Sequence, residues 1–283
     1  MVVHSVLPDA LSAAVASVLE PAGIAHVAHP GEAPMRGAEA AAGDADAIAL
    51  IGPFRSRDVA EAVEATRPVG LPLLAPVATW AGVTRVDEPG CDDPADHRGT
   101  ILRLVARDTV VAAKLAADLR ARGERALLVT GKHEYGMQVR GQLLMVGLPR
   151  VGDPGEADVL VLAGLPGEPE IERAAALAPL PVIAFDGVQG CDLGADRDVR
   201  MALPFAPVED VEPEALLAGV EHARRAAALV AAALGEGAED RTALLAALRR
   251  LGPFDVHGDP VDAPVWLWRA DAGWALAPDR ALG

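Results

Sequence analysis

The sequence is poor in aromatic and basic side chains. Aromatic residues make up 3% of the 283 positions, with a single tyrosine, and Lys114 and Lys132 are the two lysines. The formal net charge is −16, so the phosphates of a nucleic acid or an anionic membrane surface would be repelled. Because 51% of the residues are nevertheless apolar, we expect a sizeable core built from Ala, Val and Leu. The composition argues against a nucleic-acid partner.

Long apolar runs are also missing. No window reaches the roughly 18 uncharged apolar residues that a membrane span requires. The opening residues, MVVHSVLPDA, lack a basic segment followed by an apolar segment and a cleavage site. We therefore expect no membrane insertion, and a cytoplasmic location for the chain as written. A mature form whose signal had been removed would be periplasmic or extracellular.

Cysteine is scarce, and histidine shows no ligand spacing. Cys91 and Cys191 are too few for a disulfide framework or a four-thiolate metal site, and the pattern fits both a disulfide and free thiols. The seven histidines include no His-Glu-x-x-His motif. No Gly-x-Gly-x-x-Gly follows an apolar run, which argues against a dinucleotide site. We predict neither a metal nor a cofactor.

Short apolar runs alternate with Ala-rich amphipathic segments along the chain. Strands that alternate with helices form parallel sheets from βαβ units, so the predicted class is α/β. The predicted strands span 2–6, 24–28, 47–51, 72–75, 126–130, 158–162, 181–185 and 200–204, and the predicted helices span about 9–21, 36–43, 56–67, 108–122, 134–146, 168–177, 213–234 and 240–251.

The pattern divides the chain into two similar halves. An acidic insert rich in Pro, Gly and Asp at 85–99 leads through an extended crossing at 100–109 into a second set of βα units. Such an insert is typical of a domain boundary. The segment 254–278 differs from the rest, because its turn residues and clustered tryptophans predict a β-hairpin added to a sheet, with the turn at 270–273.

Ser56 follows the apolar run at 47–51 and precedes a helical pattern. It fits a helix N-cap, and it equally fits an anion site in which exposed N–H groups and the hydroxyl bind a carboxylate or phosphate. The two roles are compatible. A nucleophile elbow is disfavoured, because Arg55 and Arg57 flank the serine where that turn requires small residues.

Other polar groups also follow predicted strands. Ala78 and Thr79 come after the next strand, where their N–H groups would share a ligand with Ser56, although Thr79 equally fits a helix cap. Tyr135 is either a packed aromatic or a phenol facing a cleft. Asp186 precedes a glycine, as turn-forming residues do. Opposite an anion site, its carboxylate would instead bind the ammonium group of a zwitterion.

The segments IALIGPFRSRDVAEAV, GLPLLAPVATWAGVT, ALLVTGKHEYGMQ and PVIAFDGV occur in order within residues 45–205. Together they resemble the type I periplasmic binding proteins, specifically the leucine/isoleucine/valine-binding proteins of ABC importers. The resemblance implies two Rossmann-like lobes with parallel central sheets joined by a hinge. It implies that 1–104 plus 208–252 form lobe 1 and that 105–207 plus 253–283 form lobe 2.

The same resemblance implies roles for the five candidate residues. The α-carboxylate of an amino acid would be held by Ser56, Ala78 and Thr79, and its α-ammonium by Tyr135 and Asp186. It further implies a protein without catalytic residues that closes two lobes on an amino acid or a related zwitterion. An ABC importer permease would be its partner.

Two alternatives remain open from the residues. A cofactor-independent amino-acid racemase would use Cys91 and Cys191 as proton-transferring thiols, one from each half. Its weakness is that Cys91 lies in the acidic insert, where neighbouring carboxylates would raise a thiol pKa. A cytoplasmic amide or amino-acid sensor of the same fold would bind its ligand without transport.

Overall fold

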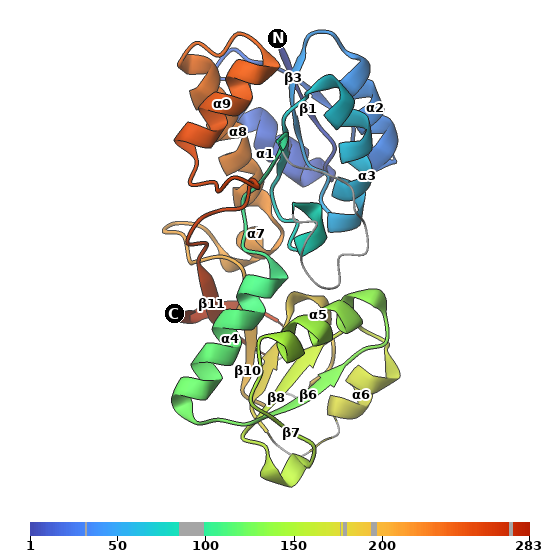
Figure 1. Ribbon diagram of the computed structural model, residues 1–283, viewed down its shortest axis with the longest axis vertical. Coiled ribbons are helices and arrows are strands. Elements are labelled where there is room, and N and C mark those ends of the chain that lie inside the picture. Colours follow the sequence, from blue (N-terminus) through green and yellow to red (C-terminus); the bar gives the residue numbers. More distant parts are fainter. Residues whose placement is uncertain (32, 85–98, 176, 178–179, 194–196, 272–273) are drawn as a thin grey trace. The chain divides into compact units, whose positions relative to one another are not determined.

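The structure is a computed structural model that describes residues 1–283 apart from 32, 85–98, 176, 178–179, 194–196 and 272–273. The chain folds into two compact units, each with its own sheet and helices (Figure 1). Unit 1 contains Met1–Ala106 and Ala215–Ala263, and unit 2 contains Arg107–Glu214 and Pro264–Gly283. The acidic insert, including Cys91, lies almost entirely outside the described residues.

Unit 1 is built on a parallel sheet with the order β2-β1-β3-β4-β5. Its strands are β1 (Val2–Ser5), β2 (Ala25–Ala28), β3 (Ala47–Ile51), β4 (Leu73–Ala75) and β5 (Ile101–Arg103). Its helices are α1 (Asp9–Leu19), α2 (Pro34–Gly43), α3 (Ser56–Thr66), α8 (Val220–Gly235) and α9 (Arg241–Leu251), with short 3-10 turns η1 (Arg67–Val69) and η2 (Ala81–Val83).

Two separate apolar clusters cover the faces of this sheet. Helices α1, α8 and α9 pack on one face and α2 and α3 on the other. The amphipathic period predicts this arrangement, since α3 buries Val59, Ala62, Val63 and Thr66 at helical spacing. Helix α8 buries mainly alanines, whose small side chains let it pack closely against α1. The core is therefore aliphatic, as the composition predicts.

Unit 2 is built on a sheet with the order β12-β11-β10-β9-β8-β6-β7. Its strands are β6 (Ala126–Thr130), β7 (Arg150–Val151), β8 (Val159–Ala163), β9 (Val182–Ala184), β10 (Val199–Leu203), β11 (Val265–Ala270) and β12 (Leu276–Leu282). Its helices are α4 (Asp108–Arg122), α5 (Glu134–Met145) and α6 (Pro169–Ala175), with turns η3 (Pro154–Glu156) and η4 (Asp186–Val188), and α7 (Pro213–Leu217) spans the boundary between the units.

The two units share one topology. In each, the first strand along the chain lies between the second and the third, as β2-β1-β3 in unit 1 and β7-β6-β8 in unit 2. The strand order therefore reverses beside β1 and beside β6. In open α/β sheets, ligands bind beyond the carboxyl ends of the strands at such a reversal. Each unit thus has a defined edge at which a site is expected.

The predicted α/β class and parallel sheets are confirmed, and so is the C-terminal hairpin. Strands β11 and β12 are antiparallel, and β11 extends the sheet beside β10. Trp268 of β11 is 1% exposed and its ring packs against Phe205. The predicted turn falls partly outside the described residues.

Several features differ from the predicted elements and boundaries. The single helix predicted over 213–234 is wrong, because the chain breaks between α7 and α8 at Gly219, whose φ is 79°. Within the predicted crossing at 100–109, Ile101–Arg103 pairs with β4 as the fifth strand of the sheet. Residues 253–263, assigned to lobe 2 from the sequence, pack in unit 1, where the Gly258 carbonyl accepts the Arg103 N–H at 2.8 Å.

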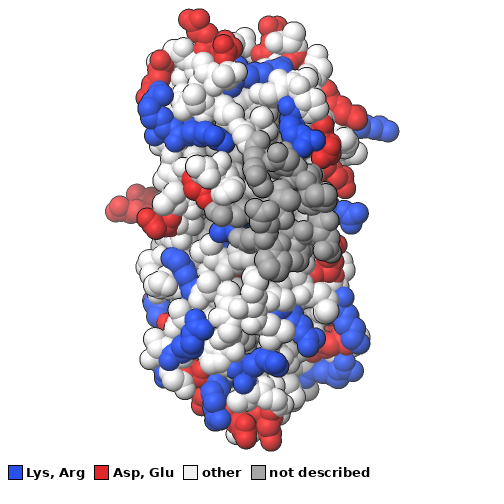
Figure 2. All heavy atoms as spheres, viewed as in Figure 1, with Lys and Arg blue, Asp and Glu red and all other residues white. Residues whose placement is uncertain are grey.

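The visible surface of each unit carries acidic and basic side chains side by side (Figure 2). Many are ion-paired, such as Arg280 with Asp118 and Arg122 with Asp118 in unit 2. Pairs of this kind at a solvated surface contribute little to stability. Among the described helices, none has both the length and the apolar character needed to cross a bilayer.

Candidate functional site

Ser56 is the first residue of α3, just past the carboxyl end of β3. Its Oγ accepts the main-chain N–H groups of Thr79 and Trp80, each at 3.2 Å. The predicted capping role is wrong, because Arg55 occupies the cap position of α3 and no side chain caps there. A hydroxyl that accepts two hydrogen bonds still has its own proton to donate. Ser56 therefore joins α3 to the segment after β4 and can donate to a ligand oxygen.

Ala78 and Thr79 lie in the segment that follows β4. Ala78 is 1% exposed and Thr79 is half-buried. Thr79 does not cap the following turn, since Trp80 occupies the cap position of η2 without a side-chain bond. The structure thus brings Ser56 and Thr79 together, as predicted from their places after neighbouring strands, through the Thr79 N–H. The Trp80 N–H is an additional donor that the sequence did not indicate.

The surroundings of Ser56 favour negative charge. The N-terminus of a helix carries a partial positive charge, and the exposed Arg55 and Arg57 flank Ser56 there. Asp58, in the same turn, offsets part of this advantage with its own carboxylate. Burial raises the pKa of the Asp58 carboxyl, although Arg55 and Arg57 act in the opposite direction. This end of unit 1 can therefore bind an anion.

Tyr135 and Asp186 come together in unit 2, from different loops. Tyr135 is in the first turn of α5, which follows β6, and Asp186 begins η4, which follows β9. The phenol hydroxyl donates to the Asp186 carboxylate. Gly187 permits this contact, since a Cβ there would lie 2.4 Å from the Tyr135 ring. The Asp-Gly pair that resembled a simple turn is needed for the aromatic ring to lie against it.

The protonation state of Tyr135 follows from its surroundings. Burial raises the pKa of its phenol well above the usual 10, and the carboxylates of Asp186 and Asp108 raise it further. Tyr135 therefore remains a proton donor at neutral pH and cannot act as a base. A carboxylate has about four acceptor positions, so Asp186 keeps several after accepting the phenol. The pair offers acceptor capacity held in a fixed orientation, which suits an ammonium group.

Glu168 is a site residue that the sequence analysis missed. Its carboxylate accepts the N–H groups of His133 at 2.8 Å and Leu165 at 2.7 Å, which follow β6 and β8. Burial acts to raise the Glu168 pKa, but these donors and the Lys132 N–H outweigh it, so the pKa is lowered. The available signal was the three-residue spacing from Leu165, as in the returning half of a capping box. The N–H donors that follow β6 and β8 in unit 2 are thus already bonded to a carboxylate of the protein itself, that of Glu168.

The racemase alternative loses support at Cys191. This thiol is free and half-buried, and burial raises its pKa, with Glu172 adding to the shift. Proton abstraction needs a thiolate, which a raised pKa disfavours. Cys91 lies outside the described residues.

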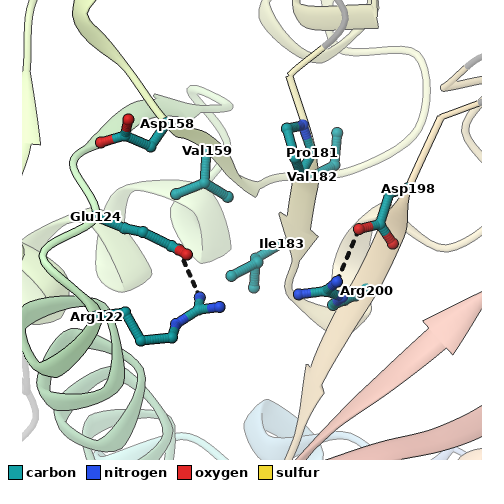
Figure 3. A pocket seen from close by; sticks show the side chains of 9 residues that line it. All are labelled: Arg122, Glu124, Asp158, Val159, Pro181, Val182, Ile183, Asp198 and Arg200. Atoms are coloured by element: carbon teal, nitrogen blue, oxygen red, sulfur yellow. Dashed lines mark hydrogen bonds and ion pairs between the residues drawn. The ribbon is translucent and has the colours of Figure 1, made fainter.

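A separate hollow of about 170 Å³ lies at the opposite edge of the unit 2 sheet (Figure 3). Its apolar floor includes Val159 and Val182, the first residues of β8 and β9. Its charged rim pairs internally, as Figure 3 shows: Arg122 lies 2.6 Å from Glu124, and Arg200 lies 2.8 Å from Asp198. This hollow is at the amino ends of the strands, whereas the candidate residues follow the carboxyl ends.

No family model and no curated protein matches the sequence. Solved structures do match. An ABC transporter substrate-binding protein from Desulfitobacterium hafniense, in complex with Leu, is 20% identical with a TM-score of 0.73 over 99% of both chains. The branched-chain amino acid transporter substrate-binding protein LivJ from Streptococcus pneumoniae, in complex with isoleucine, is 14% identical with a TM-score of 0.71 over 99% of this chain and 98% of its own.

A third solved structure extends the range of ligands. The solute-binding protein of an ABC transporter from R. palustris, in complex with benzoate, is 16% identical with a TM-score of 0.67. The match covers 100% of this chain and 96% of that chain. These neighbours are binding proteins, and the similarity extends over both units. The chain therefore has the two-lobed α/β fold of the type I periplasmic binding proteins.

Proposed function

We propose that the protein binds a free amino acid, or a closely related small zwitterion, and releases it unchanged. The observation that carries this proposal is the Tyr135–Asp186 pair, a fixed acceptor in one unit, together with the donor group around Ser56 in the other. Each unit would bind one charged end of the same ligand. Solved neighbours with this fold hold Leu and isoleucine, which supports the assignment of the ligand class.

The carboxylate end belongs to unit 1. The Ser56 hydroxyl donates to one ligand oxygen, and the N–H groups of Ala78 and Thr79 complete the set. The Thr79 N–H donates to Ser56 Oγ at 3.2 Å, so a ligand oxygen beside Ser56 would share this donor with the hydroxyl. The positive end of α3 adds a favourable charge interaction.

The ammonium end belongs to unit 2. Asp186 accepts from the ammonium in a charge-assisted bond, while Tyr135 holds the carboxylate in place. Burying a charge without a partner costs several kcal/mol, which is subtracted from the free energy of binding. A ligand such as benzoate has no cation for Asp186, so the pair favours a zwitterion over a simple acid.

Calorimetry with L-leucine and two truncated analogues tests this proposal. Isopentylamine lacks the carboxylate and isocaproate lacks the ammonium. We expect L-leucine or L-isoleucine to bind and both analogues to bind at least about a hundredfold more weakly. Equal affinity for isocaproate or benzoate would show that the ammonium has no role. Absence of a thermal shift with every one of the twenty amino acids would overturn the proposal as a whole.

Transport is the biological role we propose, with the permease of an ABC importer as partner and a location outside the inner membrane. A solved structure with this fold, from Burkholderia xenovorans, is a branched chain amino acid ABC transporter periplasmic ligand-binding protein, which supports this location. Uptake of labelled leucine should fall in cells that lack the protein. A cytoplasmic sensor would leave uptake unchanged. A racemase would exchange the α-proton of L-leucine in deuterated water, and we expect no exchange.

A further inference from the structure

A buried polar cluster in unit 1 contains Trp80, Thr84, Arg103 and Asp259, and is called here the Arg103 cluster. The Arg103 side chain is fully buried, and its Nη2 donates to the Trp80 carbonyl at 2.8 Å and to the Thr84 Oγ1 at 2.9 Å. Its Nε lies 3.2 Å from an oxygen of Asp259, a side chain that is 4% exposed. Thr84 completes the cluster by donating to the same oxygen at 2.5 Å.

The stability of unit 1 is a poor explanation for this cluster. Removing two charges from water costs about as much as their attraction returns, so a buried ion pair contributes little net stability. What such a cluster does fix is geometry, because each fully buried polar atom requires its partner in place. The segments that it connects therefore indicate its role.

Two of these segments are places where the chain passes between the units. Arg103 ends β5, shortly before the passage at Ala106, and Asp259 precedes the passage at Ala263. Their backbones also pair, since the Arg103 N–H donates to the Gly258 carbonyl at 2.8 Å. Gly258 has a φ of 88°, and a Cβ there would lie 2.0 Å from the carbonyl oxygen of Ile101. The close approach of the two passages thus depends on this glycine.

The third segment is the turn that carries the N–H donors of the candidate site. The Trp80 carbonyl accepts from Arg103, and the Trp80 N–H donates to Ser56 Oγ. One residue therefore contacts both the buried cluster and the serine. Thr84, at the end of the same turn, bonds to Arg103 and to Asp259.

We propose that the Arg103 cluster is a positioning device for the carboxylate site. It holds the Thr79–Trp80 turn in its binding conformation and ties that turn to the two chain passages. None of its side chains needs to touch the ligand. The expected effect of the cluster on ligand affinity rests on the proposed function. Its expected effect on the conformation of the Thr79–Trp80 turn does not.

Thr84→Val is the variant that tests this proposal. Valine has nearly the shape of threonine, so the change removes the hydroxyl without opening a cavity or leaving a charge without its ion-pair partner. Thr84→Ser keeps the hydroxyl and serves as the conservative control. We expect the Thr79 and Trp80 amides of Thr84→Val to exchange with deuterated water about tenfold faster without any ligand. We expect its Kd for L-leucine to rise about tenfold. Thr84→Ser should match the wild type in both.

Arg241→Met is the control for a loss of stability of unit 1 that does not involve the Thr79–Trp80 turn. Arg241 also connects separate segments of unit 1. Its guanidinium group donates to the carbonyls of Ala47, Asp44 and Val69 at 2.8 to 2.9 Å. Asp44 and Val69 precede β3 and β4, so these contacts lie at the opposite edge of the sheet. This variant should lower the Tm and leave both the two amides and the Kd unchanged.

The outcomes separate the two proposals. Unchanged exchange of Thr79 and Trp80 in Thr84→Val would overturn the positioning role, as would equal acceleration in Arg241→Met. Faster exchange in Thr84→Val alone, in a protein that binds none of the twenty amino acids, would support the positioning role and reject the proposed function.

Discussion

Units 1 and 2 repeat the same strand order, yet they present groups of opposite polarity beyond the carboxyl ends of their strands. In unit 1, the Ser56 hydroxyl and the N–H groups of Thr79 and Trp80 gather at the start of α3. In unit 2, the corresponding N–H donors after β6 and β8 already donate to the Glu168 carboxylate. The group left to interact with a ligand there is the Asp186 carboxylate, which accepts from Tyr135. The topology therefore supplies the place, and a few side chains decide the sign of the charge that each unit would favour.

Replacing the acceptor of unit 2 should have the largest effect. Asp186→Asn keeps the shape of the side chain and a partner for Tyr135 but removes the charge that faces the ammonium. We expect the affinity for L-leucine, measured by calorimetry, to fall by about a hundredfold or more. Asp198→Asn is the matched control, because this carboxylate pairs with Arg200 at the other edge of the same sheet. If the Asp186→Asn protein bound L-leucine with nearly the affinity of the wild type, Asp186 would not be the acceptor for the ammonium group.

Replacing the donor of unit 1 should have a smaller effect. Ser56→Ala would remove one hydrogen bond to the carboxylate and the acceptor of the Thr79 and Trp80 N–H groups, but it leaves those N–H groups and the helix terminus available to a ligand. We expect L-leucine to bind about tenfold to a hundredfold more weakly. Weak binding of isopentylamine, which has no carboxylate, should not change. Ser17→Ala is the control, since Ser17 bonds only a carbonyl of its own helix among its described contacts. Equal losses for both ligands would place Ser56 outside the carboxylate site.

The smallest effect concerns stability and its pH dependence. The Glu168 pKa in the folded protein lies below the ordinary value of 4.5, so its ionised form stabilises unit 2. This contribution is present above pH 4.5 and is lost as the pH falls through the folded pKa. Glu168→Gln should therefore be less stable than the wild type at pH 7, and the difference should shrink in acid. Denaturant unfolding at both pH values measures it.

Glu172→Gln is the control for that comparison. Glu172 is exposed and lies on α6, the helix that begins directly after Glu168, so its replacement should change stability little at either pH. A stability difference for Glu168→Gln that stays constant between neutral and acid pH would contradict the role of the carboxylate as an internal anion.

The alternation of strands and helices could be predicted because burial leaves a periodic trace in the sequence. Strand β7 was not predicted because two residues are too few to show a period. Strand β5 lies in the segment at 100–109, which the sequence pattern indicated only as an extended crossing between the halves. The split at Gly219 was missed because the flanking residues continue a helical pattern, and a single glycine is tolerated in many helices.

The candidate residues were found by their places after strands, but their partners were not. Periodicity reports which residues are buried, and says nothing of which main-chain groups they meet. For Ser56, a helix cap therefore fitted the sequence as well as an anion site did, and neither interpretation indicated that its oxygen binds N–H groups of a distant turn. Glu168 and Arg103 were missed for the same reason, because most of their bonds are to main-chain atoms or to residues far along the sequence.

The hairpin that completes unit 2 also sets an order for synthesis. Strand β10 is made before Ala215–Ala263 of unit 1, whereas its neighbour β11 is made only after that segment. Throughout that interval, one edge of β10 has no strand to pair with, and an open strand edge is a template for wrong association. The ribosome must therefore finish the helices of unit 1 before unit 2 can close its sheet, so the two units are interleaved in time as well as in sequence.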